Sequence, residues 1–438
     1  PPPPPHPPTP PPRRAPSPPH QPERSFHSAR HGNTRGMGIT MTTTLKALGT
    51  TDAMFRERIA DVLPVVADNT AQAERERQVP SQNIEALHDA GFFAAFRPSR
   101  FGGLEVGADV YGPALVELAG ACASTAWASG LLAQHSHMIA LMSDELQHEI
   151  WDDDSSALVS SSVAPLGKAE AAGGGIRLTG RFSWSSGCDH ADWAILGFRW
   201  PDPLLDDAPT THYAIVHRSD YAIHDDWFVA GLNGTGSKTL VVDDVFVPEH
   251  RIESAYALSS GQSKGFGSND GDIYHTHFAH WFAMGFSAVS VGIARRFLEV
   301  YAEKVSGRVR AYTGAKVGES APAYMRLAES DHQVNAAMAT LVADWTAFTD
   351  LARERKLPTS EQDVYWRSNQ SYATKLAIEA VDRLFTASGG SAWFTDNEMQ
   401  RLWLDSKMTG AHTYSDYDIA AQSHVRSLLG LPRDSATF

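Results

Sequence analysis

The sequence has only two cysteines in 438 residues, Cys122 and Cys188, and it lacks any long uninterrupted apolar run. Two cysteines cannot build a disulfide framework, so we expect a protein of the reducing cytoplasm. Polar residues such as His135 and Arg295 break the longest apolar regions, so no segment reaches the length of a membrane span. The net charge of −14 argues against a nucleic-acid partner, which would require basic stripes on the surface.

The first forty residues are rich in proline and almost free of aliphatic side chains. Such a segment cannot bury enough apolar surface to offset the entropy lost on ordering, so we predict a disordered leader over residues 1–40. It contains no apolar stretch of the kind that a secretory signal needs. One interpretation is a polyproline ligand for a partner. We favour the other, an upstream leader before a true start at Met37 or Met41.

The rest of the chain divides into regions by its hydrophobic period. Residues 41–151 have helical periodicity, and residues 152–255 alternate as short strands between Gly, Pro and Asp turns. Long amphipathic helices return over residues 278–438. A Gly- and Ser-rich stretch, residues 256–277, is predicted to be a loop or a lid. This order predicts an α+β protein in which a small antiparallel β-domain lies between two helical domains.

Two helix boundaries can be predicted from local signals. The segment SQNIEALHDAGFFAAF is expected to be one helix that begins with Ser81 as its N-cap and ends near Pro98. The last long helix, which contains YATKLAIEAVDRLFTASGG, is expected to end at Gly389 and Gly390.

One stretch, FSWSSGCDHADWAIL at residues 182–196, begins as a strand and then stops alternating. Two serines, a glycine, a thiol, an acid and an imidazole interrupt apolar residues that would suit a sheet. The simplest interpretation is a β-turn with ordinary serine hydrogen bonds. The alternative is a corner that presents a hydroxyl and backbone groups to a ligand, where glycine allows close approach.

Two segments resemble the acyl-CoA dehydrogenase superfamily. GLNGTGSKTLVVDDVFVP, residues 231–248, is similar to the segment that closes its β-domain, and LFTASGGSAW, residues 384–393, is similar to a turn near its flavin. The resemblance implies an acyl-CoA dehydrogenase-like fold with an N-terminal helical domain, a middle antiparallel β-domain and a C-terminal four-helix bundle. The dehydrogenases use a glutamate base in the C-terminal region, where SKMTGAHTYSDYD offers His412 instead.

A longer match distinguishes between the members of that superfamily. Residues 159–193 closely resemble the oxygenase components of two-component flavin-dependent aromatic hydroxylases. The resemblance implies reduced FMN (FADH2 is the alternative), O2, a separate NAD(P)H:flavin reductase, a small phenolic or polycyclic aromatic substrate and a homotetramer. It also implies that hydroxylation proceeds through a flavin C4a-hydroperoxide. An N- or S-oxygenase of the same fold and an acyl-CoA dehydrogenase stay open as alternatives, and so does a non-enzymatic scaffold.

The resemblance also assigns roles to individual side chains. Ser186 matches the serine held against flavin N5, and His135 matches the histidine that contacts the phenol and accepts its proton. Trp127 matches an apolar wall of the pocket, Ser161 a polar contact to flavin or substrate, and His412 a group near the flavin edge. For His135 and Trp127, plain core packing is the competing interpretation.

Anchoring of the flavin phosphate requires cations and hydroxyls. The resemblance points to Arg310 for this role, with Thr235 and Ser237 as further cofactor-binding candidates. The sequence departs from the family pattern at Asn233 and Leu404, where relatives carry arginine, and this puts the details of the anchoring in doubt.

The segment YHTHFAH, residues 274–280, is dense in histidine. A metal site would need three ligands with suitable geometry, and the implied hydroxylation needs no metal. We therefore expect no metal and interpret the segment as part of a mobile lid over the substrate.

Overall fold

The computed structural model describes residues 50–309 and 312–432. The leader expected over residues 1–40 lies outside these residues. The described residues belong to one compact unit that begins near residue 48. Among them, no helix has both the length and the apolar character required to cross a membrane.

The N-terminal region is helical, and its centre is a helix that is buried along its whole length. The helices are α1 (Thr50–Asp68), α2 (Thr70–Glu76), α3 (Ser81–Asp89), α4 (Ala108–Ala121), α5 (Ala123–Ala140) and α6 (Asp144–Trp151). Every residue of α5 is buried, as its nearly continuous apolar sequence predicts. Short 3-10 helices at Phe92–Ala94 and Ser99–Phe101 link α3 to α4.

The helix predicted for residues 81–96 is shorter than expected. It ends at Asp89 because Gly91 adopts a left-handed φ of 82°, which an α-helix cannot continue through. Ser81 is the first residue of α3 rather than its N-cap, a position that Pro80 occupies without a side-chain cap hydrogen bond.

The middle region forms a seven-stranded sheet in the order β5-β6-β2-β1-β3-β4-β7. Its strands are β1 (Val159–Ala172), β2 (Gly175–Ser185), β3 (Trp193–Asp202), β4 (Ala208–His217), β5 (Ala222–His224), β6 (Lys238–Pro248) and β7 (Ile252–Ser254). The prediction of a wholly antiparallel domain was wrong, because β1 and β3 pair in parallel. The corner after β2 carries the chain across to the free edge of β1, so β3 runs in the same direction as β1.

Alternate residues of β3 contact two different cores, as the two-residue period of a strand requires. Trp193 and Ile195 belong to the large core shared with the helices. Ala194, Leu196 and Phe198 belong to a second core within the sheet. One face of the sheet is therefore packed against the helical region, and α5 contacts β1 there.

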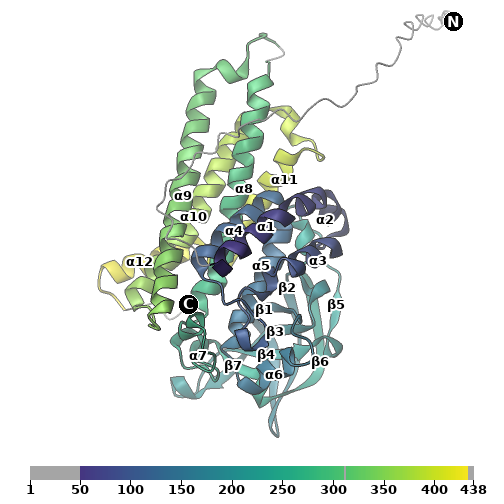
Figure 1. The fold of residues 1–438 in the computed structure, drawn as a ribbon, viewed down its shortest axis with the longest axis vertical. Helices are drawn as coiled ribbons and strands as arrows, with labels where there is room; N and C mark the ends of the chain where they lie inside the picture. The colour runs from purple at the N-terminus through teal and green to yellow at the C-terminus, as the bar shows by residue number, and fades with distance from the viewer. Residues whose placement is uncertain (1–49, 310–311, 433–438) are drawn as a thin grey trace, which may run out of the picture. The chain divides into compact units, whose positions relative to one another are not determined.

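The C-terminal region is helical and is built around three long helices that contact one another (Figure 1). The helices are α7 (Ala255–Ser260), α8 (Ala279–Gly307), α9 (Ala321–Arg353), α10 (Ser360–Ala387), α11 (Glu398–Thr409) and α12 (Tyr417–Leu428). Helix α11 packs against α8 and α10, and α12 packs against α10. The predicted end of α10 is confirmed, because Gly389 has a left-handed φ of 75° just beyond it.

The predicted lid, residues 256–277, contains most of α7 and a 3-10 helix at Asp272–His275. Its second half is attached to the N-terminal helices. The Tyr274 hydroxyl donates to the carbonyl of Phe96, and the His137 ring hydrogen-bonds the carbonyl of Ile273. Earlier in the segment, Asn269 donates to the carbonyl of Ala140 at 2.8 Å and the Gly265 N–H donates to the carbonyl of Leu141 at 3.0 Å, so these residues too are bonded to the N-terminal helices.

Candidate active site

The strand β2 ends in a sharp corner at Ser186. Trp184 and Gly187 both adopt left-handed backbone conformations, with φ of 66° and 71°. A side chain at Gly187 would also meet Leu132 of α5, since a Cβ there would lie 2.9 Å from its Cδ1 atom. Glycine is therefore required at the corner by its own φ and by contact with α5. The Ser186 side chain at this corner is buried.

Three hydroxyl groups form a continuous chain that ends at Ser186. The Ser186 and Ser237 oxygens lie 2.7 Å apart, and those of Ser237 and Thr235 lie 2.8 Å apart. The Thr235 hydroxyl donates to the carbonyl of Leu232 at 2.9 Å. Two of the predicted cofactor-binding residues, Thr235 and Ser237, thus contact each other, and Ser237 also contacts Ser186.

His135 lies in the middle of α5 with one ring nitrogen paired and the other unpaired. Its Nδ1 atom is 2.6 Å from the carbonyl oxygen of Val159 in β1. Because a carbonyl only accepts, Nδ1 carries the proton and Nε2 is left as an acceptor. That Nε2 is buried without a hydrogen-bond partner. Burial lowers the pKa of His135 to about 4, against the opposing effect of the Val159 carbonyl.

The corner and His135 lie on the same side of α5. Leu132, which contacts Gly187, and His135 are three residues apart and share one helix face. The Ser185 hydroxyl donates to the Ser160 hydroxyl of β1, one residue after the carbonyl that His135 contacts. Helix α5, the start of β1 and the end of β2 therefore meet at one place.

Aromatic side chains of α8 connect three of the predicted site residues. Phe286 packs against Trp127 and stacks on His412, with ring centres 5.0 and 4.0 Å apart. Phe282 lies 5.4 Å from Phe286 and stacks on His135 at 5.9 Å. Trp127, His135 and His412 thus surround one aromatic cluster. Phe282 and Phe286 could not be predicted from the sequence, because the apolar pattern of α8 does not distinguish a pocket wall from core.

His412 has the tautomer opposite to that of His135. Its Nδ1 accepts the backbone N–H of Tyr414, so the proton of the neutral ring is on Nε2. Burial, with a smaller effect from the charge of Arg367, lowers the pKa of His412 to about 4. The site therefore has an acceptor nitrogen from His135 and a donor nitrogen from His412.

Ser161 lies on the face of β1 opposite to its neighbours Ser160 and Ser162, as the two-residue period of a strand requires. Ser160 and Ser162 are bonded within the sheet, to the Ser185 hydroxyl and the Ser183 carbonyl. The Ser161 side chain is 8% exposed and has no hydrogen-bond partner among the described residues. Ser161 shares its strand face with Val159, whose carbonyl binds His135.

A buried carboxylate that the sequence analysis missed supports the hydroxyl chain. Asp405 of α11 accepts the backbone N–H of Leu232 at 2.6 Å. Burial raises the pKa of Asp405 to about 7, and the nearby Glu74 carboxylate acts in the same direction. Burial raises the pKa of the Glu74 carboxyl as well, and the neighbouring Asn233 side chain opposes that rise. No local sequence signal links residues so far apart in the chain.

The predicted phosphate ligand Arg310 lies outside the described residues. Its described neighbour Arg308 donates to the carbonyls of Ala387 and Ser388, at 3.1 and 2.7 Å. The Arg308 guanidinium therefore binds the C-terminal end of α10, where free carbonyls favour a cation.

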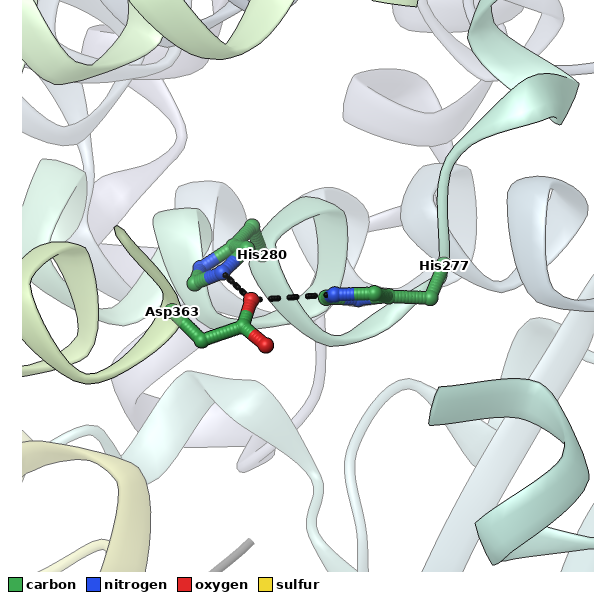
Figure 2. A group of neighbouring side chains, drawn as sticks. All are labelled: His277, His280 and Asp363. Carbon is green, nitrogen blue, oxygen red and sulfur yellow. Dashed lines mark hydrogen bonds and ion pairs between the residues drawn. The ribbon is translucent and has the colours of Figure 1, made fainter. Parts of the chain in front are cut away.

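The histidine-dense segment meets a carboxylate from a distant helix (Figure 2). The Nε2 atoms of His277 and His280 lie 3.0 and 2.8 Å from the same Oδ1 atom of Asp363 in α10. Burial alone would raise the pKa of Asp363, but the two histidines outweigh it and hold the pKa below its ordinary value. The three groups could ligate a metal. Here both imidazoles point at one oxygen (Figure 2), so they form a hydrogen-bonded cluster that joins the start of α8 to the start of α10.

Both helical regions match known protein families. Residues 50–151 match the family described as acyl-CoA dehydrogenase, N-terminal domain. Residues 284–417 match the family described as acyl-CoA dehydrogenase, C-terminal domain. The predicted fold class agrees with these matches.

Individual relatives align over most of the chain. It is 47% identical over 379 residues to the oxygenase component of p-hydroxyphenylacetate 3-hydroxylase from Acinetobacter baumannii, covering 86% of this chain and 89% of that protein. It is 34% identical over 384 residues to the oxygenase component of an FADH2-dependent resorcinol hydroxylase from a Rhizobium species, covering 85% of this chain and 93% of that protein. The crystal structure of 3-HSA hydroxylase from Rhodococcus sp. RHA1 superposes with a TM-score of 0.82 at 32% identity, over 88% of this chain and 99% of that one.

Proposed function

The chain belongs to the family of oxygenase components of flavin-dependent hydroxylases, and we propose that it hydroxylates a small phenol with reduced flavin and O2. We further propose that a separate NAD(P)H:flavin reductase supplies the flavin, because the relatives are named as components of larger systems. These relatives favour hydroxylation over the N- or S-oxygenase and the acyl-CoA dehydrogenase that the sequence left open.

The observation that carries the phenol proposal is the unpaired Nε2 atom of His135. A buried acceptor without a partner costs about 1–3 kcal/mol, so a ligand with an O–H group at this point is favoured. A phenol offers that group on an aromatic ring, and Phe282, which stacks on His135, provides a matching surface. By accepting a hydrogen bond from the phenol O–H at Nε2, His135 would raise the electron density of the ring at the carbon that is to be hydroxylated.

The remaining groups fit a flavin beside that phenol. Reduced flavin, when bound, supplies the electrons and the position at which O2 is activated. The Ser186 hydroxyl at the corner would bind its N5 edge, and the unpartnered Ser161 hydroxyl would bind flavin or substrate. His412 would donate from Nε2, and Trp127 would exclude water from one side. Thr235 and Ser237 would hold Ser186 in place, and Arg310 would bind the phosphate.

We also propose a homotetramer. Trp393 and Phe394, beyond the end of α10, are 57% and 67% exposed. Large exposed aromatic side chains next to each other are typical of an interface between subunits. Light scattering on the purified protein measures the mass directly, and a monomer at micromolar concentration would contradict this part of the proposal.

The function is tested by product analysis. The protein is mixed with reduced FMN, or reduced FAD in parallel, in aerated buffer that contains 4-hydroxyphenylacetate or resorcinol. We expect a hydroxylated product, and we expect His135→Ala to lower its yield per flavin about a hundredfold. The His135→Ala protein should still oxidise the flavin, with H2O2 in place of the product.

The matched control is His148→Ala, which removes an exposed imidazole of α6. It should hydroxylate as the unmodified protein does. No phenol product from the unmodified protein, or an equal yield from His135→Ala, would contradict the proposal. A nitrogen or sulfur substrate needs no phenol base, so its oxidation should survive His135→Ala.

A further inference from the structure

The hydroxyl chain at the corner has only one arrangement of its protons. Its far end is the carbonyl of Leu232, which can only accept, so the Thr235 O–H must donate to it. Each hydroxyl has one proton. The Thr235 oxygen must therefore accept from Ser237, and Ser237 must in turn accept from Ser186. Any other arrangement leaves two oxygens less than 3 Å apart without a proton between them.

We propose that Thr235 is a positioning residue that sets the direction of the Ser186 hydroxyl through Ser237. The Ser186 proton is committed to Ser237, so the lone pairs of Ser186 are the groups presented outside the chain. Ser186 is thereby an acceptor and not a donor toward whatever binds at the corner. This inference rests on the proposed function, in which that ligand is the N5 edge of flavin.

Burial preserves this arrangement. The exposed fractions of Thr235, Ser237 and Ser186 are 1%, 5% and 6%, so water cannot readily insert and supply a different proton. The Leu232 carbonyl is itself held in place. It also accepts from the Trp227 indole N–H at 3.2 Å, while the Leu232 backbone N–H donates to Asp405.

The direction of Ser186 discriminates between the two redox states of a flavin. Reduced flavin carries an N–H donor at N5, which matches the lone pairs of Ser186. Oxidised flavin has a lone pair at N5 and would face another lone pair, unless the whole chain reversed and lost the Thr235 to Leu232 bond. The hydroxyl chain therefore favours reduced over oxidised flavin, and Thr235 contributes to this preference without touching the cofactor.

The experiment measures the dissociation constants of reduced and oxidised FMN, the former without O2, and compares their ratio between variants. Thr235→Val keeps the shape of the side chain but removes its acceptor, which frees Ser237 to donate toward Ser186. We expect the ratio of the oxidised to the reduced constant to fall about tenfold, the effect of one hydrogen bond. Thr235→Ser should restore it, because the serine hydroxyl can take the same place in the chain. Ser237→Ala, which breaks the chain at its middle, should lower the ratio as Thr235→Val does.

Ser186→Ala separates the role of Ser186 from that of Thr235. It should lower the ratio by itself, and adding Thr235→Val to it should have no further effect. If Ser186→Ala lowers the ratio but Thr235→Val and Ser237→Ala do not, the inference about Thr235 is overturned and the role of Ser186 stands. If Ser186→Ala leaves the ratio unchanged, the inference also fails, and the yield of hydroxylated phenol then decides separately whether the proposed function survives.

Discussion

The Nδ1 atom of His135 lies 2.6 Å from the carbonyl oxygen of Val159, and this contact determines which nitrogen of the buried ring can act as an acceptor. It joins the centre of α5 to the first residue of β1. Burial of the ring, which this contact only partly offsets, lowers the pKa of His135 and makes the protein sensitive to acid.

The contribution of the buried histidines to stability should fall as the pH drops from about 6.5 to about 4. The folded-state pKa values of His135 and His412 are about 4 and that of His137 is about 3, all lowered chiefly by burial. An unfolded histidine titrates near 6.5, so the unfolded state binds more protons within this window. Urea unfolding at pH 7 and pH 4.5 measures the difference.

His135→Asn keeps a donor for Val159 but cannot titrate, so its free energy of unfolding should depend less on pH. An equal dependence would contradict this account.

Gly187→Ala should destabilise the protein by about 2 kcal/mol. The alanine must adopt a left-handed φ of 71°, and its Cβ would press against Leu132. Thermal unfolding followed by circular dichroism measures the loss. Gly173→Ala is the matched control, because a Cβ at Gly173 meets open space. Similar losses in both variants would show that the corner has no special requirement for glycine.

Asp363→Asn should destabilise the protein by about 2 kcal/mol, because it removes the charge that accepts from two buried histidines. The folded-state pKa of Asp363 is lowered, so this contribution is present above the unfolded value near 3.9 and is lost below it. Glu319→Gln, which breaks the exposed pair with Lys316, should have little effect.

The same cluster tests the expectation that the protein binds no metal there. Adding zinc to the unmodified protein should leave its melting temperature unchanged. A rise that Asp363→Asn abolishes would instead show that His277, His280 and Asp363 ligate the ion.

Asp405→Asn should stabilise the protein more at pH 8 than at pH 5. The pKa of Asp405 is raised to about 7 in the folded state, chiefly by burial. Between about 4 and 7 Asp405 therefore holds an extra proton in the folded state, and the contribution of this group to stability decreases as the pH rises. Asparagine stays neutral and can still accept the N–H of Leu232. Calorimetry at the two pH values measures the change, and an equal change at both would contradict the assignment.

Much of the fold follows from local patterns. The change of hydrophobic period marks the helical and β regions, and Gly389 marks the end of α10, because these signals lie within a few residues of one another. The parallel pairing of β1 with β3 could not be predicted, since strand order depends on which edge the chain crosses to after Ser185. The end of α3 at Asp89 was not predicted, because the sequence keeps a helical pattern on both sides of Gly91 and the left-handed φ of that glycine shows only in the fold.

The residues of the candidate site were predicted from a family resemblance, and the spacing of residues along the sequence did not predict them. The contacts that give its residues their chemistry join distant positions. Ser186 and Ser237 are 51 residues apart, and Leu232 and Asp405 are 173 apart. His280 reaches Asp363 across 83 residues. A single sequence offers no periodicity at such separations, so the direction of the hydroxyl chain and the histidine cluster emerge only from the fold.

The hydroxyl chain at the corner ends at a peptide carbonyl, and this has a consequence for proton conduction. A row of hydroxyls can relay a proton only if the last group can take it up or pass it to solvent. The Leu232 carbonyl is far too weak a base to do so, and the row is buried. A proton that reaches Ser186 therefore cannot leave the site in this direction, because the hydroxyl chain does not conduct it to solvent.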